Sequence, residues 1–285
     1  MRIEFLGVPA CGKSTLSRTL AQQLIGQGLI VSEPTFDLDH RLPKLARQWR
    51  KLCRSAAFLA LHPHTAMQDM AAILQTRQAT FGDLRKATLN WLFIRSIATA
   101  PRLPGEVTIL DQGVAQAVWS IAFAAGGGRW WFALSEVNGR GGVLPDLVVR
   151  VRTDLVIVGD RLALRAHTTS RMNKLGRDTD ALRRAEANCG VIAERLRALG
   201  IPVLEVQGNA AHDLDQGASR LAGRVLAARR NGEQLAGRRH GVKGMREPAR
   251  ERPNRFGLPR PAGSGGPASA GAAWTELTRK TSTGA

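Results

Sequence analysis

The sequence predicts an α/β protein built on one doubly wound, mostly parallel sheet of five strands. Apolar runs of strand length alternate with stretches at helical spacing, glycine or proline separates them, and the 285 residues are 44% hydrophobic. Strands that alternate with helices favour a parallel sheet with helices on its faces. A chain of this length and hydrophobicity has enough apolar material for such a domain, which excludes disorder of the whole.

The N-terminal segment predicts two strands with a helix between them. Residues 2–6 form an apolar run that ends in glycine, and leucines recur at helical spacing over residues 14–24. This pattern indicates a strand followed by a helix. Residues 29–31 predict a short second strand, and the polar, proline-bearing residues 32–35 predict the loop at its end.

The rest of the domain continues the alternation after a helical insertion. Residues 44–100, which Pro63 and Gly82 interrupt, predict two or three helices. Thr153 is expected to cap a later helix, and Gly200 to close another. The later strands are expected at residues 107–110, 147–151 and 201–206, and the later helices at residues 153–166, 181–199 and 212–229.

The composition changes after residue 230. Residues 231–285 are rich in Pro, Gly, Ser, Ala and Arg and predict a disordered tail behind a domain of residues 1–230. Lys and Arg (41) exceed Asp and Glu (23), which gives a net charge of +18. Such a charge favours partners such as nucleic acid, anionic lipid or nucleotide phosphates, and an Arg-rich composition without a ligand is the alternative explanation.

The sequence favours a cytoplasmic protein with reduced thiols and no membrane partner. The longest uncharged apolar stretch, residues 113–128, is shorter than the roughly 20 residues that a spanning helix needs. The N-terminus lacks the charged and apolar regions of a signal peptide. Three cysteines (Cys11, Cys53 and Cys189) are too few and too scattered for a disulfide framework or a four-ligand zinc site.

Residues 7–14 satisfy the phosphate-loop (P-loop) pattern G-x-x-x-x-G-K-[ST] between a predicted strand and a predicted helix. The glycines let successive N–H groups point into one concavity, and the helix dipole adds positive potential there. Lys13 is expected to reach the β- and γ-phosphates of ATP, and the Ser14 hydroxyl to bind Mg²⁺. The Cys11 thiolate is expected to be favoured and to be alkylated in a reaction that ATP blocks, and a small loop residue without this reactivity is the alternative. The predicted nucleotide-binding residues are Gly7, Val8, Pro9, Ala10, Cys11, Gly12, Lys13, Ser14 and Thr15.

Asp111 is the predicted second residue for Mg²⁺. It follows the apolar strand 107–110, so it should lie at the same carboxyl edge of the sheet as the P-loop. A helix cap is its alternative role. A guanine-nucleotide switch is disfavoured, because Val114 stands where D-x-x-G needs glycine and residues 173–176 end in glycine where N-K-x-D needs aspartate.

Over residues 1 to about 228 the chain resembles the thymidylate kinase and deoxynucleoside kinase group of P-loop kinases. The matching features are the P-loop at 7–14, Glu33-Pro34, Asp111, the run 145–149, the arginines Arg161 and Arg165, and the run 200–206. The resemblance implies ATP and Mg²⁺ as the donor system, an acceptor site among the helices of 44–100, and a lid at about 154–176. In that group the Glu-Pro glutamate lies beside the acceptor, which implies a catalytic role for Glu33. An acidic loop residue without such a role is the alternative.

Arginines after the fourth predicted strand are candidates for stabilising the transferred phosphoryl group. Arg161 and Arg165 stand four residues apart on one helix face, and Arg171 follows them. Guanidinium groups on a closing lid would stabilise the charge that develops on the phosphate oxygens. A basic helix in a basic protein is the alternative.

The chain departs from this kinase group at residue 112. The group usually has arginine after the acid of the third strand, and this chain has Gln112. A neutral amide cannot supply that charge. Arg95, Arg77 and Arg85 are candidates to replace it, unless they are solvated residues of a helix face.

The sequence therefore predicts a P-loop phosphotransferase that uses ATP and Mg²⁺ and a small-molecule acceptor. A nucleoside, a nucleotide, a sugar or another hydroxyl compound remains open as the acceptor, and the sequence does not predict the oligomeric state. The alternative is a nucleic-acid-associated P-loop ATPase whose basic tail follows the phosphate backbone. The predicted catalytic residues are Lys13, Glu33, Asp111, Arg161, Arg165 and Arg171.

Overall fold

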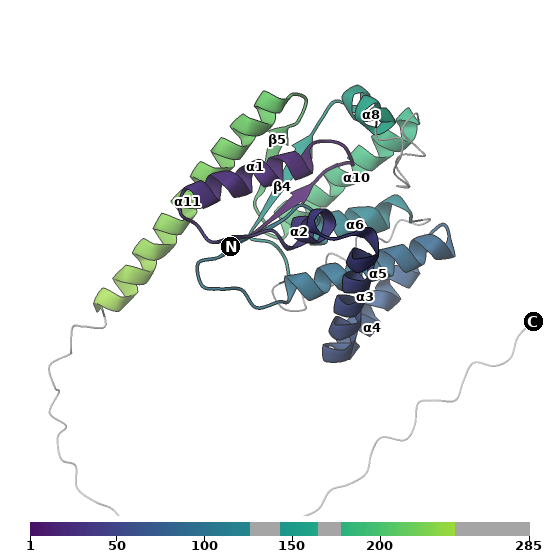
Figure 1. The fold of residues 1–285 in the computed structure, drawn as a ribbon, viewed down its shortest axis with the longest axis horizontal. Coiled ribbons are helices and arrows are strands. Elements are labelled where there is room, and N and C mark those ends of the chain that lie inside the picture. The colour runs from purple at the N-terminus through teal and green to yellow at the C-terminus, as the bar shows by residue number, and fades with distance from the viewer. Residues whose placement is uncertain (126–142, 165–177, 243–285) are drawn as a thin grey trace, which may run out of the picture. The chain divides into compact units, whose positions relative to one another are not determined.

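A computed structural model describes residues 1–125, 143–164 and 178–242 of the chain (Figure 1). Five parallel strands form one sheet in the order β2-β3-β1-β4-β5. This confirms the predicted doubly wound, five-stranded parallel sheet. The strands are β1 (Arg2–Leu6), β2 (Val31–Ser32), β3 (Val107–Leu110), β4 (Leu147–Arg152) and β5 (Val203–Gln207).

The strand order places a binding crevice beside β1. From β1 the chain builds β2 and β3 on one side and β4 and β5 on the other. In open α/β sheets, ligands bind outside the carboxyl ends of the strands at the point where the order reverses. The segment after Leu6 therefore begins at this crevice.

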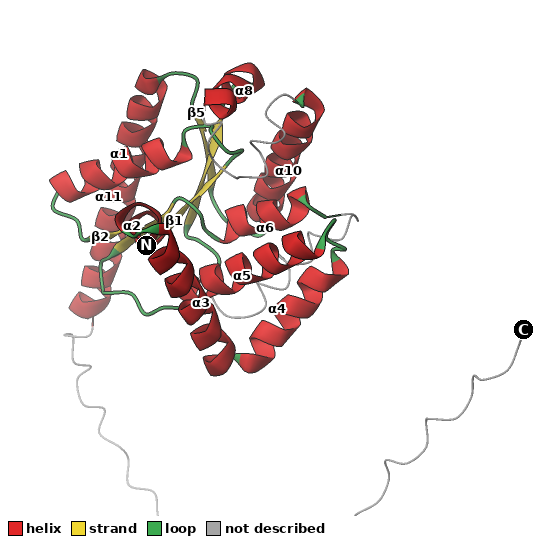
Figure 2. Cartoon of the chain, turned by 45° about the vertical axis from the view of Figure 1, so that its right-hand side comes forward, coloured by secondary structure: helices red, strands yellow, loops and turns green. Residues whose placement is uncertain are grey.

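Helices cover both faces of the sheet, with α1 and the beginning of α11 on one side and α6 and α10 on the other (Figure 2). Leu16, Leu20 and Leu24 of α1 are fully buried, as their helical spacing predicts. The helices are α1 (Lys13–Gly26), α2 (Pro34–Arg41), α3 (Lys44–Leu61), α4 (Pro63–Gln75), α5 (Phe81–Ala98), α6 (Val114–Phe123), α8 (Leu155–Leu164), α10 (Thr179–Ala198) and α11 (Ala211–Val242).

The predicted insertion of residues 44–100 folds into the three helices α3, α4 and α5, which pack against one another. Pro63 stands at the first turn of α4, where a missing N–H has no helical partner to lose. The Thr80 hydroxyl accepts a hydrogen bond from the backbone of Asp83 and so caps α5. The insertion connects β2 to β3.

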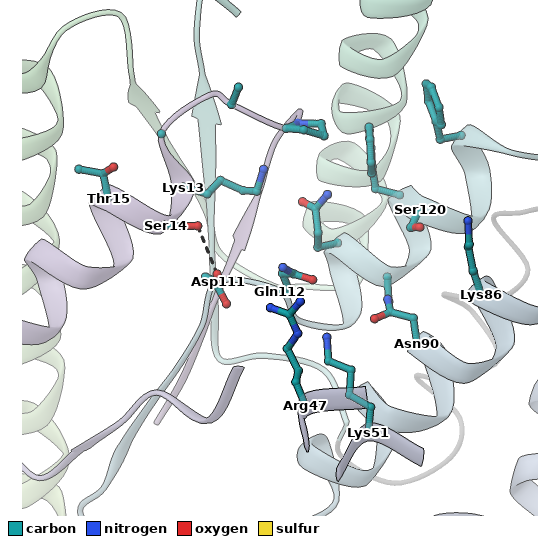
Figure 3. A pocket seen from close by; sticks show the side chains of 17 residues that line it. Lys13, Ser14, Thr15, Arg47, Lys51, Lys86, Asn90, Asp111, Gln112 and Ser120 are labelled. Carbon is teal, nitrogen blue, oxygen red and sulfur yellow. Dashed lines mark hydrogen bonds between the residues drawn. The ribbon is translucent and has the colours of Figure 1, made fainter. Parts of the chain in front are cut away.

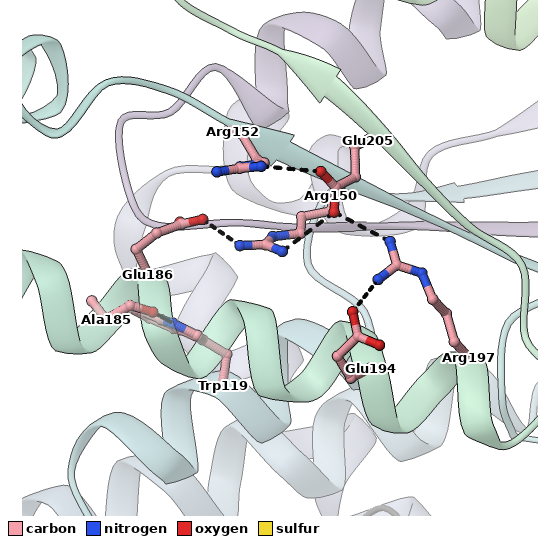
Figure 4. A network of polar contacts seen from close by, with 8 residues as sticks. All are labelled: Trp119, Arg150, Arg152, Ala185, Glu186, Glu194, Arg197 and Glu205. Carbon is pink, nitrogen blue, oxygen red and sulfur yellow. Dashed lines mark hydrogen bonds and ion pairs between the residues drawn. The ribbon is translucent and has the colours of Figure 1, made fainter.

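Ion pairs and a tryptophan hydrogen bond tie the other half of the sheet to its helices (Figure 4). Arg150 on β4 donates to Glu186 on α10 at 2.6 Å and to Glu205 on β5 at 3.3 Å. The Trp119 indole N–H on α6 donates to the carbonyl of Ala185 on α10 at 2.8 Å. These contacts fix α10 against both the sheet and α6.

Three local predictions were wrong. The expected loop at 32–35 begins a helix at Pro34, because proline fits the first turn of a helix. Thr153 does not cap α8; the carboxylate of Asp154 accepts from the backbone of Val156 instead. Helix α11 runs twelve residues beyond Arg230 to Val242, since no proline interrupts this stretch before Pro248.

The chain divides into two units, Met1–Gln234 and Leu235–Ala285. The hydrophobic core that the structure describes lies in the first unit; the burial of residues 231–285 is not described. Of the predicted tail, residues 231–242 belong to α11, and residues 243–285 lie outside the described residues. In the part of the chain that the structure describes, no helix is both long and apolar enough to span a bilayer.

Candidate active site

The P-loop connects β1 to α1 in a tight conformation that requires its first glycine. A side-chain carbon at Gly7 would lie 2.7 Å from both the sulfur of Cys11 and the carbonyl oxygen of Val151. Farther along, Ala10 and Gly12 have left-handed backbone with φ of 67° and 99°. These residues therefore form the compact turn that the motif predicts.

The P-loop faces a cavity of about 710 Å³ at the carboxyl edge of the sheet (Figure 3). This volume lies within the range of small-molecule sites. The Lys13 ammonium donates to the carbonyl oxygens of Gly7 at 2.7 Å and Val8 at 2.8 Å, so it lies across the loop. The P-loop residues that line the cavity are Pro9, Ala10, Gly12, Lys13, Ser14 and Thr15.

Three of the predicted nucleotide-binding residues do not line this cavity. The side chains of Val8 and Cys11 are fully buried, and Gly7 packs behind the loop. The Gly7 N–H donates to the side-chain oxygen of Gln116 at 3.3 Å, and the Cys11 N–H donates to the Val8 carbonyl at 3.3 Å. Val8 and Cys11 thus anchor the loop in the core. The prediction that the Cys11 thiol is accessible is wrong, because this side chain is buried.

Ser14 and Asp111 lie together at the edge of the cavity. The Ser14 hydroxyl donates to Oδ2 of Asp111 at 3.3 Å, and the Thr35 hydroxyl donates to Oδ1 of the same carboxylate at 2.6 Å. Hydroxyl and carboxylate oxygens are ligands that Mg²⁺ accepts, with water and phosphate oxygens filling its other positions. Sequence reasoning missed Thr35, which was assigned to a loop.

The donor set fits Mg²⁺ better than a metal held by protein alone. Within residues 1–125, 143–164 and 178–242, no group of three or more His, Cys, Asp or Glu side chains is placed to hold a metal ion. Mg²⁺ is commonly bound through one or two protein ligands together with substrate phosphates. Ser14 and Asp111 meet that requirement beside the P-loop.

Helices α3, α5 and α6 form the rest of the cavity wall (Figure 3). Arg47 and Lys51 come from α3, and Lys86 and Asn90 from α5. Each pair stands four residues apart, so both members share one helix face. That spacing was the sequence signal for these four residues, which the sequence analysis did not single out. Gln112 also lines the cavity.

The arginines proposed to replace the missing charge at Gln112 do not reach the cavity. Arg95 is 1% exposed, and its Nε lies 3.0 Å from Oδ2 of the equally buried Asp69. Its guanidinium also lies 5.6 Å from the ring centre of Phe58. Arg77 and Arg85 are exposed and absent from the cavity lining. Arg95 is therefore a core residue, which neither of the sequence interpretations anticipated.

Glu33 lines a second cavity, of about 460 Å³, together with residues of α2 and α3. It is 6% exposed, and its Oε2 forms a 2.5 Å ion pair with Arg18. Burial raises the pKa of Glu33 above its ordinary value, although the hydrogen bond from Arg18 acts in the opposite direction. Arg50, Arg54 and Phe93 line the same cavity. Glu33 does not line the cavity of the P-loop.

Arg161 on α8 contacts backbone carbonyls rather than the cavity. Its guanidinium donates to Gly208 at 2.9 Å, to Asn209 at 2.8 Å and, less closely, to Ala10 at 3.4 Å. Arg165 and Arg171 lie outside the described residues, as do residues 165–176 of the predicted lid.

The fold is a P-loop α/β fold of the nucleotide-binding class. Its defining features are strand β1, the loop at Gly7–Ser14, helix α1 and the hydrogen bond from Ser14 to Asp111. The bound group that this class implies, a Mg²⁺ nucleotide, fits the oxygen donors of Ser14 and Asp111 and the cation of Lys13.

Searches of known proteins matched solved structures only. No protein-family model and no curated protein matches the sequence. A deoxyadenosine kinase from M. mycoides with bound dCTP matches with 13% identity and a TM-score of 0.43, over 78% of this chain and 100% of the kinase chain. A thymidylate kinase from Candida albicans matches with 16% identity and a TM-score of 0.44, over 80% of this chain and 92% of that chain. Both belong to the group that the sequence motifs resemble.

Proposed function

We propose that this protein is an ATP- and Mg²⁺-dependent phosphotransferase that transfers a phosphoryl group to a small hydroxyl or phosphate acceptor. The observation that carries this proposal is the two-sided cavity. A P-loop with its Ser14–Asp111 pair forms one wall, and cations of an inserted helical layer form the other. A P-loop ATPase needs only the first wall, and a second, separately built polar wall suits an acceptor.

The donor wall would bind the nucleotide through its backbone N–H groups and Lys13. The Lys13 ammonium can exchange the carbonyl oxygens of Gly7 and Val8 for phosphate oxygens, because the lysine side chain is flexible. Ser14 and Asp111 would hold Mg²⁺, which when bound supplies charge neutralisation on the phosphates.

The acceptor wall would orient the second substrate. Arg47, Lys51 and Lys86 offer positive charge, and Asn90 and Gln112 offer amide groups for hydrogen bonding. In this proposal the acceptor hydroxyl lies in the P-loop cavity, and Glu33 turns from the second cavity towards it to accept its proton. Arg165 and Arg171 are proposed to stabilise the transferred group. Burial raises the pKa of Glu33, which makes its carboxylate a stronger base than an exposed glutamate.

The proposal is tested by ADP release from the full chain with Mg-ATP and a panel of nucleosides, nucleoside monophosphates and sugars. We expect release to depend on one class of acceptor. It should fall by at least about a hundredfold in Lys13→Ala, because the proposal assigns this lysine to the β- and γ-phosphates of ATP. The matched control is Lys44→Ala, an exposed lysine that lines neither cavity. If no acceptor changes the rate of ADP release and nucleic acid increases it, the result would contradict the proposal and favour the ATPase.

A further inference from the structure

Two side chains from beyond β4 bind the outer side of the P-loop. The hydroxyl of Thr153 donates to the carbonyl of Cys11 at 2.9 Å, and Arg161 contacts the neighbouring carbonyl of Ala10 at 3.4 Å. Thr153 is 8% exposed, so its hydrogen bond is protected from water. Neither Thr153 nor Arg161 lines the cavity.

Arg161 and Asp154 join the same segment to the turn between β5 and α11. Arg161 donates to the carbonyls of Gly208 and Asn209, and the Asn209 side chain accepts from the backbone of Asp154 at 2.8 Å. A side-chain carbon at Gly208 would lie 2.4 Å from the Cys11 carbonyl oxygen and 2.6 Å from the Thr153 hydroxyl. Gly208 thus lets the turn approach the back of the loop.

We propose that Thr153 and Arg161 are positioning residues that preorganise the P-loop for phosphate by holding the carbonyls of Ala10 and Cys11 away from the cavity. This inference rests on the proposed function, since it assigns a purpose to the loop conformation.

The physical argument follows from the planarity of the peptide bond. In a trans peptide, the C=O of one residue and the N–H of the next point in opposite directions. A hydrogen bond from Thr153 that fixes the Cys11 carbonyl therefore also fixes the direction of the Gly12 N–H, and Gly12 lines the cavity. Without this hydrogen bond, the peptide between Cys11 and Gly12 can rotate and turn its carbonyl oxygen towards the cavity. That oxygen would repel the negatively charged phosphate.

A second reason is the backbone conformation of Ala10. Its φ of 67° is unfavourable for a residue with a side chain. Such a conformation persists only where surrounding contacts hold it. The Arg161 guanidinium, anchored on Gly208 and Asn209, is positioned to limit the movement of the Ala10 carbonyl.

The test measures Mg-ATP affinity of the full chain by calorimetry for Thr153→Val, with Thr153→Ser as the matched control. Valine keeps the shape and removes the hydroxyl, whereas serine keeps the donor. We expect affinity to fall roughly five- to tenfold in Thr153→Val, as a lost neutral hydrogen bond usually costs, and to return to within twofold of the parent in Thr153→Ser. The melting temperature is recorded in parallel, and binding is measured at least 15 °C below it.

Arg161→Lys separates positioning from charge. Lysine keeps the positive charge but cannot bind several carbonyls in a fork. For Arg161→Lys we expect a loss of Mg-ATP affinity like that of Thr153→Val. In the double variant Thr153→Val/Arg161→Lys, the fold loss of affinity should be smaller than the product of the two single losses, because both residues act on one loop.

The outcomes are distinguishable. A parent chain that binds no Mg-ATP would overturn the proposed function and the purpose of these contacts with it. A parent that binds, together with a Thr153→Val chain of equal affinity, would overturn the positioning role alone. Parental affinity in Arg161→Lys with a large loss in Arg161→Met would show that Arg161 acts through its charge.

Discussion

The Thr35 hydroxyl and Asp111 form a 2.6 Å hydrogen bond at the edge of the P-loop cavity, on the opposite oxygen from the one that Ser14 contacts. Thr35 therefore orients the carboxylate proposed to hold Mg²⁺. Partners of metal ligands commonly change metal affinity by 10- to 100-fold when removed. In Thr35→Val we expect the Mg²⁺ concentration for half-maximal ADP release to rise about tenfold, and Thr35→Ser to restore it. An unchanged Mg²⁺ requirement in Thr35→Val would contradict this role.

Glu33→Gln tests the proposed general base. The substitution keeps the shape of the side chain and removes its basicity, so acceptor-dependent turnover should fall by about a hundredfold, while Mg-ATP affinity stays within about twofold. Because burial raises the pKa of Glu33 above 4.5, the acid limb of the pH profile of kcat/KM should also lie above that value and should vanish in the variant. Parental turnover in Glu33→Gln would place the base elsewhere.

Glu4 should make the stability depend on pH. This fully buried carboxyl of β1 accepts from the backbone of Ala115 at 3.0 Å, and burial raises its pKa from 4.5 to about 7 against the effect of that hydrogen bond. Since the pKa is higher in the folded state, its contribution is complete below pH 4.5 and is lost as the pH rises through 7. A shift from 4.5 to about 7 corresponds to about 3 kcal/mol.

Urea unfolding of the parent and of Glu4→Gln at pH 5 and pH 8 measures this contribution. We expect the free energy of unfolding of the parent to fall relative to that of the variant between the two pH values. Subtracting the variant removes the contributions of the other groups. An equal change in both proteins would show that Glu4 titrates alike in the folded and unfolded chains.

The buried pair of Arg95 and Asp69 should be needed for stability. Removing one partner leaves an uncompensated charge in the core, so Arg95→Met should lower the free energy of unfolding by about 3–5 kcal/mol. The double variant Arg95→Met/Asp69→Leu should recover most of the loss, because neither charge of the pair remains. Arg85→Met, an exposed site on the same helix, serves as the control, with a change of about 0.5 kcal/mol or less. A loss in the double variant equal to that of Arg95→Met would contradict the ion-pair explanation.

The thiols should differ sharply in reactivity. Cys53 is exposed, whereas Cys11 and Cys189 are buried, and burial also raises the pKa of Cys189. Since thiolate and access both govern alkylation, the native chain should label at Cys53 alone, and Cys53→Ser should not label until denatured. Rapid labelling of Cys11 in native Cys53→Ser, blocked by ATP, would restore the original expectation for this residue.

The sheet and the donor wall were predictable because their signals are local. The eight residues of the P-loop and the acid after an apolar strand define chemistry by spacing, and parallel strands bring both to one edge. Thr35 was missed because no spacing rule connects it to Asp111, and the two meet only through the pairing of β2 with β3.

The acceptor wall was harder to predict because α3 is oriented against the usual rule. An amphipathic helix normally buries its apolar face. Here Leu45 and Trp49 are 81% and 68% exposed, while Arg47 and Lys51 face the cavity. A prediction from hydrophobic periodicity alone would therefore have placed Arg47 and Lys51 on the solvent-facing side of α3.

The close approach at Gly208 has a consequence for how this protein can vary. The Cys11 carbonyl and the Thr153 hydroxyl fill the space that a side chain at residue 208 would need. Cys11 lies about two hundred residues earlier in the sequence, and Thr153 about fifty. Any heritable change that enlarges residue 208 must be accompanied by changes in both other segments. The eight-residue motif is thus only the contiguous part of a unit whose remaining members must be inherited together with it, and a P-loop transplanted without them would lack its backing.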